Sequence, residues 1–193
     1  MIFVFDLDDT VCDSDAYSEE CIANFIKENN LPYKKVRDNT RFADEKFDWD
    51  SETSNKWYKI YGDEMMLNFP CKKNTKEVIS KLKELGHTVI FATARSTDWH
   101  KDPEGISREW LKNNNINYNK LIVGRFDKEL VCKEENADVF VDDDLKIVAN
   151  VANSNKNTKV FLANTKYNSQ FEIPNLVTRL YDFKELLDLV DKD

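Results

Sequence analysis

Ile2-Phe3-Val4-Phe5-Asp6-Leu7-Asp8-Asp9-Thr10, at the start of the chain, is the stretch that decides the fold. Its first four residues are all apolar, and they are β-branched or aromatic, which is typical of a strand buried on both faces of a parallel sheet. Acidic residues follow at once and end the strand. We therefore expect a short, fully buried strand with carboxylates at its carboxyl end.

Similar apolar runs follow along the chain and alternate with segments of helical periodicity. The predicted strands cover residues 88–92, 121–123, 139–141 and 160–162. A helix between the first two strands begins at Asn74, with Glu77 completing a capping box, and ends at Gly86. The last helix begins with a second capping box, Asp182 and Glu185. This alternation predicts an α/β fold, a Rossmannoid parallel sheet with helices on both faces.

One segment interrupts this alternation. Residues 13–73 contain no convincing strand, and their apolar residues recur at helical spacing around Phe25 and again around Trp57. A connection between neighbouring strands normally needs far less chain. We therefore predict a small helical cap, residues 13–73, inserted after the first strand of a core domain made of residues 1–12 and 74–193.

Composition limits the classes of partner. The net charge is −8, so the basic surface typical of proteins that bind long nucleic acid is not expected. A small phosphorylated substrate remains possible, because a metal ion and a few basic groups suffice locally. No apolar run approaches the roughly 20 residues that span a bilayer. Four cysteines without a CxxC pair are typical of reduced thiols in a cytoplasmic protein. The oligomeric state is not indicated.

Polar side chains follow several of the predicted strands. In a doubly wound sheet, ligands bind outside the carboxyl ends of the strands, so these side chains are expected to meet at one edge. They are Asp6, Asp8, Thr93, Arg95, Asp142 and Asp143, together with Lys128 at the start of the helix after the third strand.

This set of residues suits phosphoryl transfer. Crowded carboxylates repel one another unless a cation lies between them, and oxygen ligands suit Mg²⁺. Asp6 could then attack phosphorus as a nucleophile. Asp8 could protonate the leaving oxygen and later activate water. Thr93 and Lys128 would hold the phosphoryl oxygens. Arg95 could bind a phosphate or a sugar hydroxyl, or it could pair with a neighbouring acid; both roles stay open.

Each residue also has a structural explanation when taken alone. Asp8, Asp9 and Asp13 could cap a following helix, and so could the acids at 142–144. Thr93 could be an ordinary hydroxyl at a strand end, and Lys128 a solvated surface lysine. Their joint occurrence at successive strand ends favours a functional site.

The four groups together resemble the motifs of the haloacid dehalogenase (HAD) superfamily. Residues 6–10 look like its DxDxT motif, while Thr93, Lys128 and Asp142-Asp143 are similar to its second, third and fourth motifs. The resemblance implies a HAD-like fold with Asp6 as nucleophile and Asp8 as acid and base. It implies Mg²⁺ held by Asp6, the main-chain carbonyl of Asp8 and an acid of the fourth motif, with Asp142 favoured over Asp143. The inserted segment falls where the superfamily places its type-one cap.

Shorter similarities indicate the substrate. Residues 93–95, 109–111, 120–123, 127–128 and 167–168 resemble the 5′(3′)-deoxyribonucleotidase group, which implies a nucleoside monophosphate as substrate. Residues 95–110 resemble the 3′-phosphatase domain of phage polynucleotide kinase, and another small phosphorylated metabolite is a third possibility. The predicted cap and the negative net charge favour a mononucleotide substrate over the end of a polynucleotide. Phe42 and Phe47 are the candidates to stack on a base, although the cap aromatics could simply form the cap's own core.

Three other classes are less consistent with the sequence. Two-component receiver domains also gather acids, a Thr and a Lys around Mg²⁺, but their phosphorylated Asp ends a middle strand, where this chain has Thr93. A binding protein with a retired site would not be expected to fill all four motifs. A phosphomutase shares the chemistry and stays an alternative.

Overall fold

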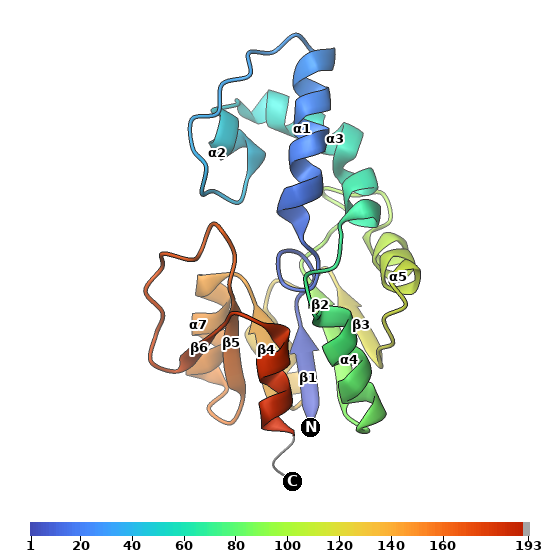
Figure 1. The fold of residues 1–193 in the computed structure, drawn as a ribbon, viewed down its shortest axis with the longest axis vertical. Helices are drawn as coiled ribbons and strands as arrows, with labels where there is room; N and C mark the ends of the chain where they lie inside the picture. The colour runs from blue at the N-terminus through green and yellow to red at the C-terminus, as the bar shows by residue number, and fades with distance from the viewer. Residues whose placement is uncertain (191–193) are drawn as a thin grey trace.

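The structure, a computed structural model, describes residues 1–190. Within these residues a six-stranded parallel sheet has the order β3-β2-β1-β4-β5-β6 (Figure 1). The strands are β1 (Ile2–Phe5), β2 (Thr88–Thr93), β3 (Lys120–Val123), β4 (Val139–Asp142), β5 (Lys159–Ala163) and β6 (Val177–Leu180). The predicted α/β parallel sheet is confirmed. Because the strand order reverses between β1 and β4, the crevice for a ligand lies at their carboxyl ends.

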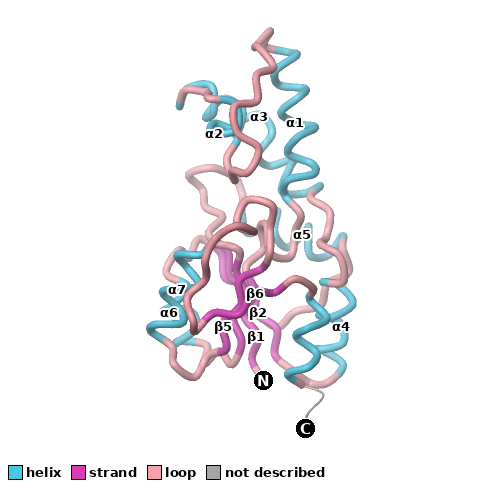
Figure 2. The backbone as a smooth tube through the Cα atoms, turned by 60° about the vertical axis from the view of Figure 1, so that its left-hand side comes forward, coloured by secondary structure: helices cyan, strands magenta, loops and turns pink. Residues whose placement is uncertain are grey.

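Helices cover both faces of the sheet, as predicted (Figure 2). The helices of the core are α4 (Thr75–Glu84), α5 (Pro103–Asn113), α6 (Lys128–Glu134), α7 (Leu145–Ser154) and the 3₁₀ helix η1 (Phe183–Leu189). Alternate residues of a strand point to opposite faces. Phe3 and Phe5 of β1 accordingly pack with α4, α5 and η1. Val4, between them, packs with α6 and α7.

The helix ends differ in part from the prediction. The capping box at Asn74 is wrong: Asn74 has a φ of 66° and caps α4 with no side-chain hydrogen bond. Its amide instead donates to both carboxylate oxygens of Asp182, at 2.9 and 2.8 Å. The second predicted box, Asp182 and Glu185, does form, but it begins a 3₁₀ helix. Gly86 lies just after α4 with a φ of 82°, as its position predicts.

Residues 13–73 form a helical layer above the carboxyl edge of the sheet (Figure 1). Its helices are α1 (Ser14–Glu28), α2 (Ala43–Phe47) and α3 (Ser51–Asn68). Phe25 of α1 and Trp57 of α3 belong to a buried aromatic cluster centred on Trp49. The aromatic side chains of the cap therefore pack on one another, and they belong to the same apolar cluster as buried residues of β1 and α4.

The two chain segments that join the cap to the core lie side by side. Cys12 and Cys71 form an antiparallel bridge. The Asp13 amide donates to the Pro70 carbonyl at 2.8 Å. The indole Nε1 of Trp110 on α5 donates to the carbonyl of Phe69, at the end of α3, at 2.7 Å. Backbone and side-chain hydrogen bonds thus fix where the cap begins and ends above the sheet.

No helix of the described residues combines the length and the apolar character needed to cross a membrane.

Candidate active site

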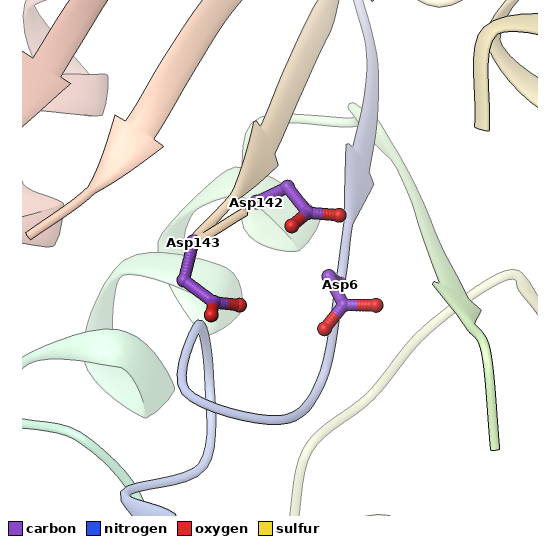
Figure 3. A group of neighbouring side chains, drawn as sticks. All are labelled: Asp6, Asp142 and Asp143. Atoms are coloured by element: carbon purple, nitrogen blue, oxygen red, sulfur yellow. The ribbon is translucent and has the colours of Figure 1, made fainter. Parts of the chain in front are cut away.

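Three buried carboxylates meet where β1 and β4 end (Figure 3). Asp6 follows β1 directly, and its amide donates to the Val141 carbonyl of β4 at 2.9 Å. Asp142 ends β4, and Asp143 is the next residue. Carboxylate oxygens of all three lie within 4.8 Å of one another. The parallel pairing of β1 with β4 is what brings these residues, distant in sequence, to one point.

The hydrogen bonds of these carboxylates fit a divalent cation. Oδ2 of Asp142 is buried and has no hydrogen-bond partner in the described part of the chain. The oxygens of Asp143 are both engaged, by Thr10 Oγ1 at 3.1 Å and by the Tyr167 hydroxyl at 2.5 Å. Burial, together with the charges of Asp6 and Asp143, raises the pKa of Asp142 well above its ordinary value. A buried acceptor without a donor, among crowded carboxylates, suits a hard cation such as Mg²⁺.

Lys128 links the nucleophile candidate to the neighbouring strand. Its ammonium, fully buried at the start of α6, donates to Asp6 Oδ1 at 2.8 Å and to the carbonyl of Ala92. Burial raises the pKa of the Asp6 carboxyl, and the charge of Lys128 opposes that rise. Thr93 ends β2 nearby, where its buried Oγ1 accepts from the Arg95 amide at 3.3 Å. The expected strand-end group is therefore assembled in space.

Arg95 pairs with Asp8. Its Nε lies 2.8 Å from Oδ2 of Asp8, its Nη2 lies 2.5 Å from Oδ1, and its Nη1 donates to Ser107 at 3.0 Å. Burial alone would raise the pKa of Asp8, but the charge and hydrogen bonds of Arg95 outweigh it and lower that pKa. Of the two roles left open for Arg95, the structure shows the pairing with an acid.

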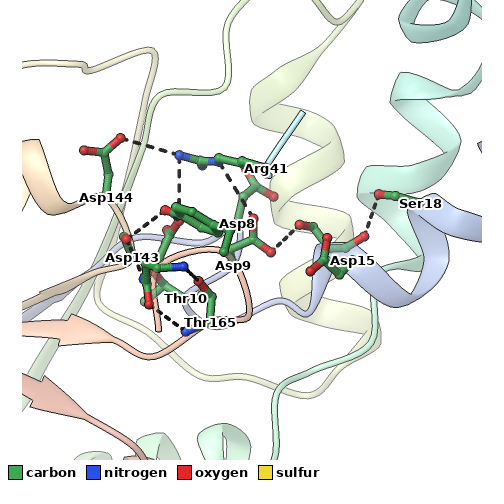
Figure 4. Close-up of polar contacts among 12 residues, drawn as sticks. Asp8, Asp9, Thr10, Asp15, Ser18, Arg41, Asp143, Asp144 and Thr165 are labelled. Carbon is green, nitrogen blue, oxygen red and sulfur yellow. Dashed lines mark hydrogen bonds and ion pairs between the residues drawn. The ribbon is translucent and has the colours of Figure 1, made fainter. Parts of the chain in front are cut away.

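A second arginine, which the sequence analysis did not single out, reaches the acids from the cap (Figure 4). Arg41 lies in the loop between α1 and α2. Its guanidinium nitrogens lie 3.8 Å from Asp9, 3.7 Å from Asp143 and 3.7 Å from Asp144. A single arginine in a charged segment has no periodicity or motif that marks it, so only the folded cap reveals its position.

The Tyr167-Asn168 pair also lies at the site. The Tyr167 hydroxyl contacts Asp143, and the fully buried amide of Asn168 donates to the carbonyls of Asp143 and Ala163, each at 2.9 Å. The Asn168 carbonyl oxygen accepts from the Thr165 amide at 3.0 Å, which is turn chemistry. This loop after β5 therefore orients Asp143.

A cavity of about 170 Å³ lies between the cap and the segment that follows β1. Asp8 and Asp9 line it from below, and Arg41, Phe42 and Tyr58 line it from the cap. Phe42 is 47% exposed, so its ring is open to a ligand. The expectation for Phe47 needs correcting: its side chain is buried and its ring stacks on that of Trp49, with the ring centroids 5.4 Å apart.

No protein-family model matches the chain, and no curated protein matches it significantly. Solved structures do match the chain in fold, over nearly the whole length of both chains. A putative phosphatase from Clostridium difficile is 15% identical, with a TM-score of 0.71 over 98% of this chain and 97% of that one. The putative HAD-hydrolase YfnB from Bacillus subtilis, bound to magnesium, is 13% identical, with a TM-score of 0.67 over 98% of each chain.

A predicted phosphoglycolate phosphatase from Haemophilus somnus is 15% identical to the chain, with a TM-score of 0.63 over 98% of this chain and 97% of that one. At these identities the likeness establishes the fold. The chain has the HAD-like α/β fold.

Proposed function

We propose that this chain is a Mg²⁺-dependent phosphomonoester hydrolase with Asp6 as its covalent nucleophile. The observation that carries the proposal is the position of Asp6, which lies buried between the Lys128 ammonium at 2.8 Å and the carboxylates of Asp142 and Asp143. A carboxylate held beside a cation and a cluster of potential metal ligands is equipped to attack phosphorus. The likeness in fold to a putative phosphatase and to a predicted phosphoglycolate phosphatase supports the same reaction class.

The proposed reaction has two steps. In the first, an Asp6 oxygen bonds to phosphorus, the bond from phosphorus to the leaving oxygen breaks, and Asp8 gives that oxygen a proton. In the second, Asp8 takes a proton from water as the water oxygen attacks phosphorus, which releases inorganic phosphate and restores Asp6. Lys128 and Thr93 donate to the phosphoryl oxygens. Mg²⁺, held by Asp6, Asp142 and the Asp8 main-chain carbonyl, would offset the negative charge of these groups.

The pairing of Asp8 with Arg95 constrains the first step. In the arrangement described, Asp8 is ionised and both its oxygens accept from Arg95. A carboxylate in that state has no proton to give. We infer that Asp8 releases Arg95 when substrate binds and that Arg95 then becomes available to the phosphate.

For the substrate we propose a nucleoside monophosphate. The support is the open ring of Phe42 beside the cavity, together with Tyr58. Most ligand pockets measure about 300–1,000 Å³, so the 170 Å³ cavity holds a nucleotide only if the cap opens further. This size favours, as a second candidate, a smaller phosphorylated metabolite. A polynucleotide 3′-end would have to pass the cap and is the least consistent of the three.

A substrate panel tests this proposal. We expect kcat/KM with Mg²⁺ to be higher for thymidine 5′- or 3′-monophosphate than for glycerol phosphate or a 3′-phosphorylated oligonucleotide. Phe42→Ala should raise KM for the nucleotides and leave glycerol phosphate unchanged. Tyr33→Ala, which alters an exposed cap aromatic away from the cavity, is the matched control. A preference for glycerol phosphate selects the second candidate, and a preference for the oligonucleotide contradicts both.

A further inference from the structure

Arg41 reaches from the cap to the carboxylates of Asp9, Asp143 and Asp144. It lies two residues before α2 and lines the cavity together with Asp8 and Asp9 (Figure 4). Its side chain is 27% exposed and its guanidinium lies 5.8 Å from the centre of the Phe42 ring. The charge of the cap therefore faces the space where a substrate would lie.

The guanidinium keeps its donors available. Its contacts with Asp9, Asp143 and Asp144 measure 3.7–3.8 Å. Hydrogen bonds to oxygen measure about 2.7–3.2 Å, so these contacts are attractions between charges without a hydrogen bond. Among residues 1–190, none accepts a hydrogen bond from the Arg41 side chain. A guanidinium carries five N–H donors in a planar fork that matches phosphate oxygens.

Two other cations near Asp6 and Asp8, Lys128 and Arg95, are engaged by protein groups before substrate binds. Lys128 donates to Asp6 and to the carbonyl of Ala92. Arg95 donates to Asp8 through two nitrogens and to Ser107 through a third. A phosphate group entering a rim of carboxylates meets repulsion unless a cation with free donors faces it. Arg41 has that property and comes from the cap.

We propose that Arg41 binds the phosphoryl group of the substrate, donating to its non-bridging oxygens from the cap side. This inference rests on the proposed phosphatase function and adds a phosphate ligand that lies outside the four core motifs. Because the ligand belongs to the cap, tight phosphate binding requires the cap to be closed. Substrate binding and cap closure are then one coupled event, and hydrolysis takes place away from bulk water.

The variants Arg41→Gln, Arg41→Lys and Arg37→Gln test the proposal. Arg37 is an exposed arginine in the same cap segment, so its substitution removes the same charge away from the cavity. Two readouts are needed: calorimetric binding of inorganic phosphate in the presence of Mg²⁺, and KM and kcat for p-nitrophenyl phosphate and glycerol phosphate. Thermal unfolding of each variant shows whether it folds.

We expect Arg41→Gln to weaken phosphate binding and to raise KM for both esters by a similar factor, about 10- to 100-fold, as for the loss of charge-assisted hydrogen bonds. Arg41→Lys keeps the charge but loses the planar guanidinium, so its phosphate affinity and KM should lie between those of the wild type and Arg41→Gln. Arg37→Gln should match the wild type in both quantities. If Arg41→Gln does not fold, wild-type phosphate affinity in Arg41→Lys overturns the proposal.

Unchanged phosphate affinity in a folded Arg41→Gln overturns the proposal, and so does a rise in KM for only one ester, which would place Arg41 on the leaving group. A wild-type protein that binds phosphate through Arg41 but hydrolyses no ester contradicts the proposed function and leaves the Arg41 site standing. Calorimetry thus separates the two failures.

Discussion

Asp142 and Asp143 are neighbours in the chain, yet their carboxylates have different surroundings. Oδ2 of Asp142 lacks a donor, whereas Asp143 accepts from Thr10 and from Tyr167. We therefore propose Asp142 as the direct metal ligand, and we interpret Asp143 as a carboxylate whose position is fixed by its own hydrogen bonds. The expectation that favoured Asp142 from the sequence gains a physical reason.

We predict that Asp142→Asn raises the Mg²⁺ concentration needed for half-maximal activity more than Asp143→Asn does. Loss of a group that only orients a metal ligand typically weakens metal binding about 10- to 100-fold, which is the effect expected for Asp143→Asn. Loss of a direct ligand in Asp142→Asn should weaken metal binding more than that. A Mg²⁺ titration of phosphate release measures both variants, with thermal unfolding as the check on folding. A larger increase in the required Mg²⁺ concentration for Asp143→Asn would indicate that Asp143, and not Asp142, is the direct metal ligand.

Arg95 sets the protonation of Asp8. Its charge and hydrogen bonds lower the pKa of Asp8 against the effect of burial. Arg95→Met removes both, so the pKa of Asp8 should rise and Asp8 should keep its proton to higher pH. Since a general acid works while it is protonated, the alkaline limb of the kcat/KM profile for a substrate with a poor leaving group should move to higher pH, because this profile reports the free enzyme in which the two side chains are paired. A limb that stays in place or moves to lower pH would contradict this assignment of the acid.

Strand geometry decides which residues of the site could be predicted from the sequence. Strands that run parallel end at the same edge, so Asp6, Thr93 and Asp142 could be placed together from their positions after three apolar runs. Arg41 could not, because its place depends on how the cap packs on the core. Phe42 and Phe47 looked equivalent in the sequence, and only packing shows that one is open and the other buried.

At the scale of the elements, strands that contain a continuous apolar run were predicted, and a strand with polar residues inside it was not. β6 is Val177–Leu180, of which Val177 and Leu180 are buried and Thr178 is exposed. It pairs with β5 at the sheet edge. Its two apolar residues are separated by Thr178 and Arg179, so the segment lacks the apolar run that marks the other strands in the sequence. The mistaken capping box has a related cause, since Asn74 finds its partner Asp182 108 residues away.

At the scale of the elements, a hydrogen bond between α5 and the end of α3 joins the core to the cap. Trp110 is fully buried and donates to the Phe69 carbonyl. Trp110→Phe should lower the free energy of unfolding by about 1–3 kcal/mol, because a buried carbonyl loses its donor. Trp99→Phe is the control, since Trp99 is 52% exposed and surface substitutions usually change stability by about 0.5 kcal/mol or less.

Urea unfolding followed by circular dichroism measures this difference. Equal stability for the two variants would mean that the Trp110 hydrogen bond does not hold the cap to the core.

At the scale of the whole molecule, the core and the cap contribute different groups to one region. The core supplies the carboxylates at the ends of β1 and β4 and Lys128 at the start of α6, and the cap supplies Arg41 and Phe42. The HAD-like fold accounts for the first set. We expect the second set to determine which phosphate ester is bound, and it belongs to the segment whose packing the sequence left open.

The most direct measurement of the central claim is phosphate release from p-nitrophenyl phosphate by the wild type and by Asp6→Asn, with Mg²⁺ and with EDTA. Loss of a nucleophile should lower kcat by about 1,000-fold or more, with thermal unfolding close to that of the wild type. EDTA should abolish wild-type turnover, and added Mg²⁺ should restore it. A folded Asp6→Asn variant that hydrolyses the ester at nearly the wild-type rate would contradict the assignment of Asp6.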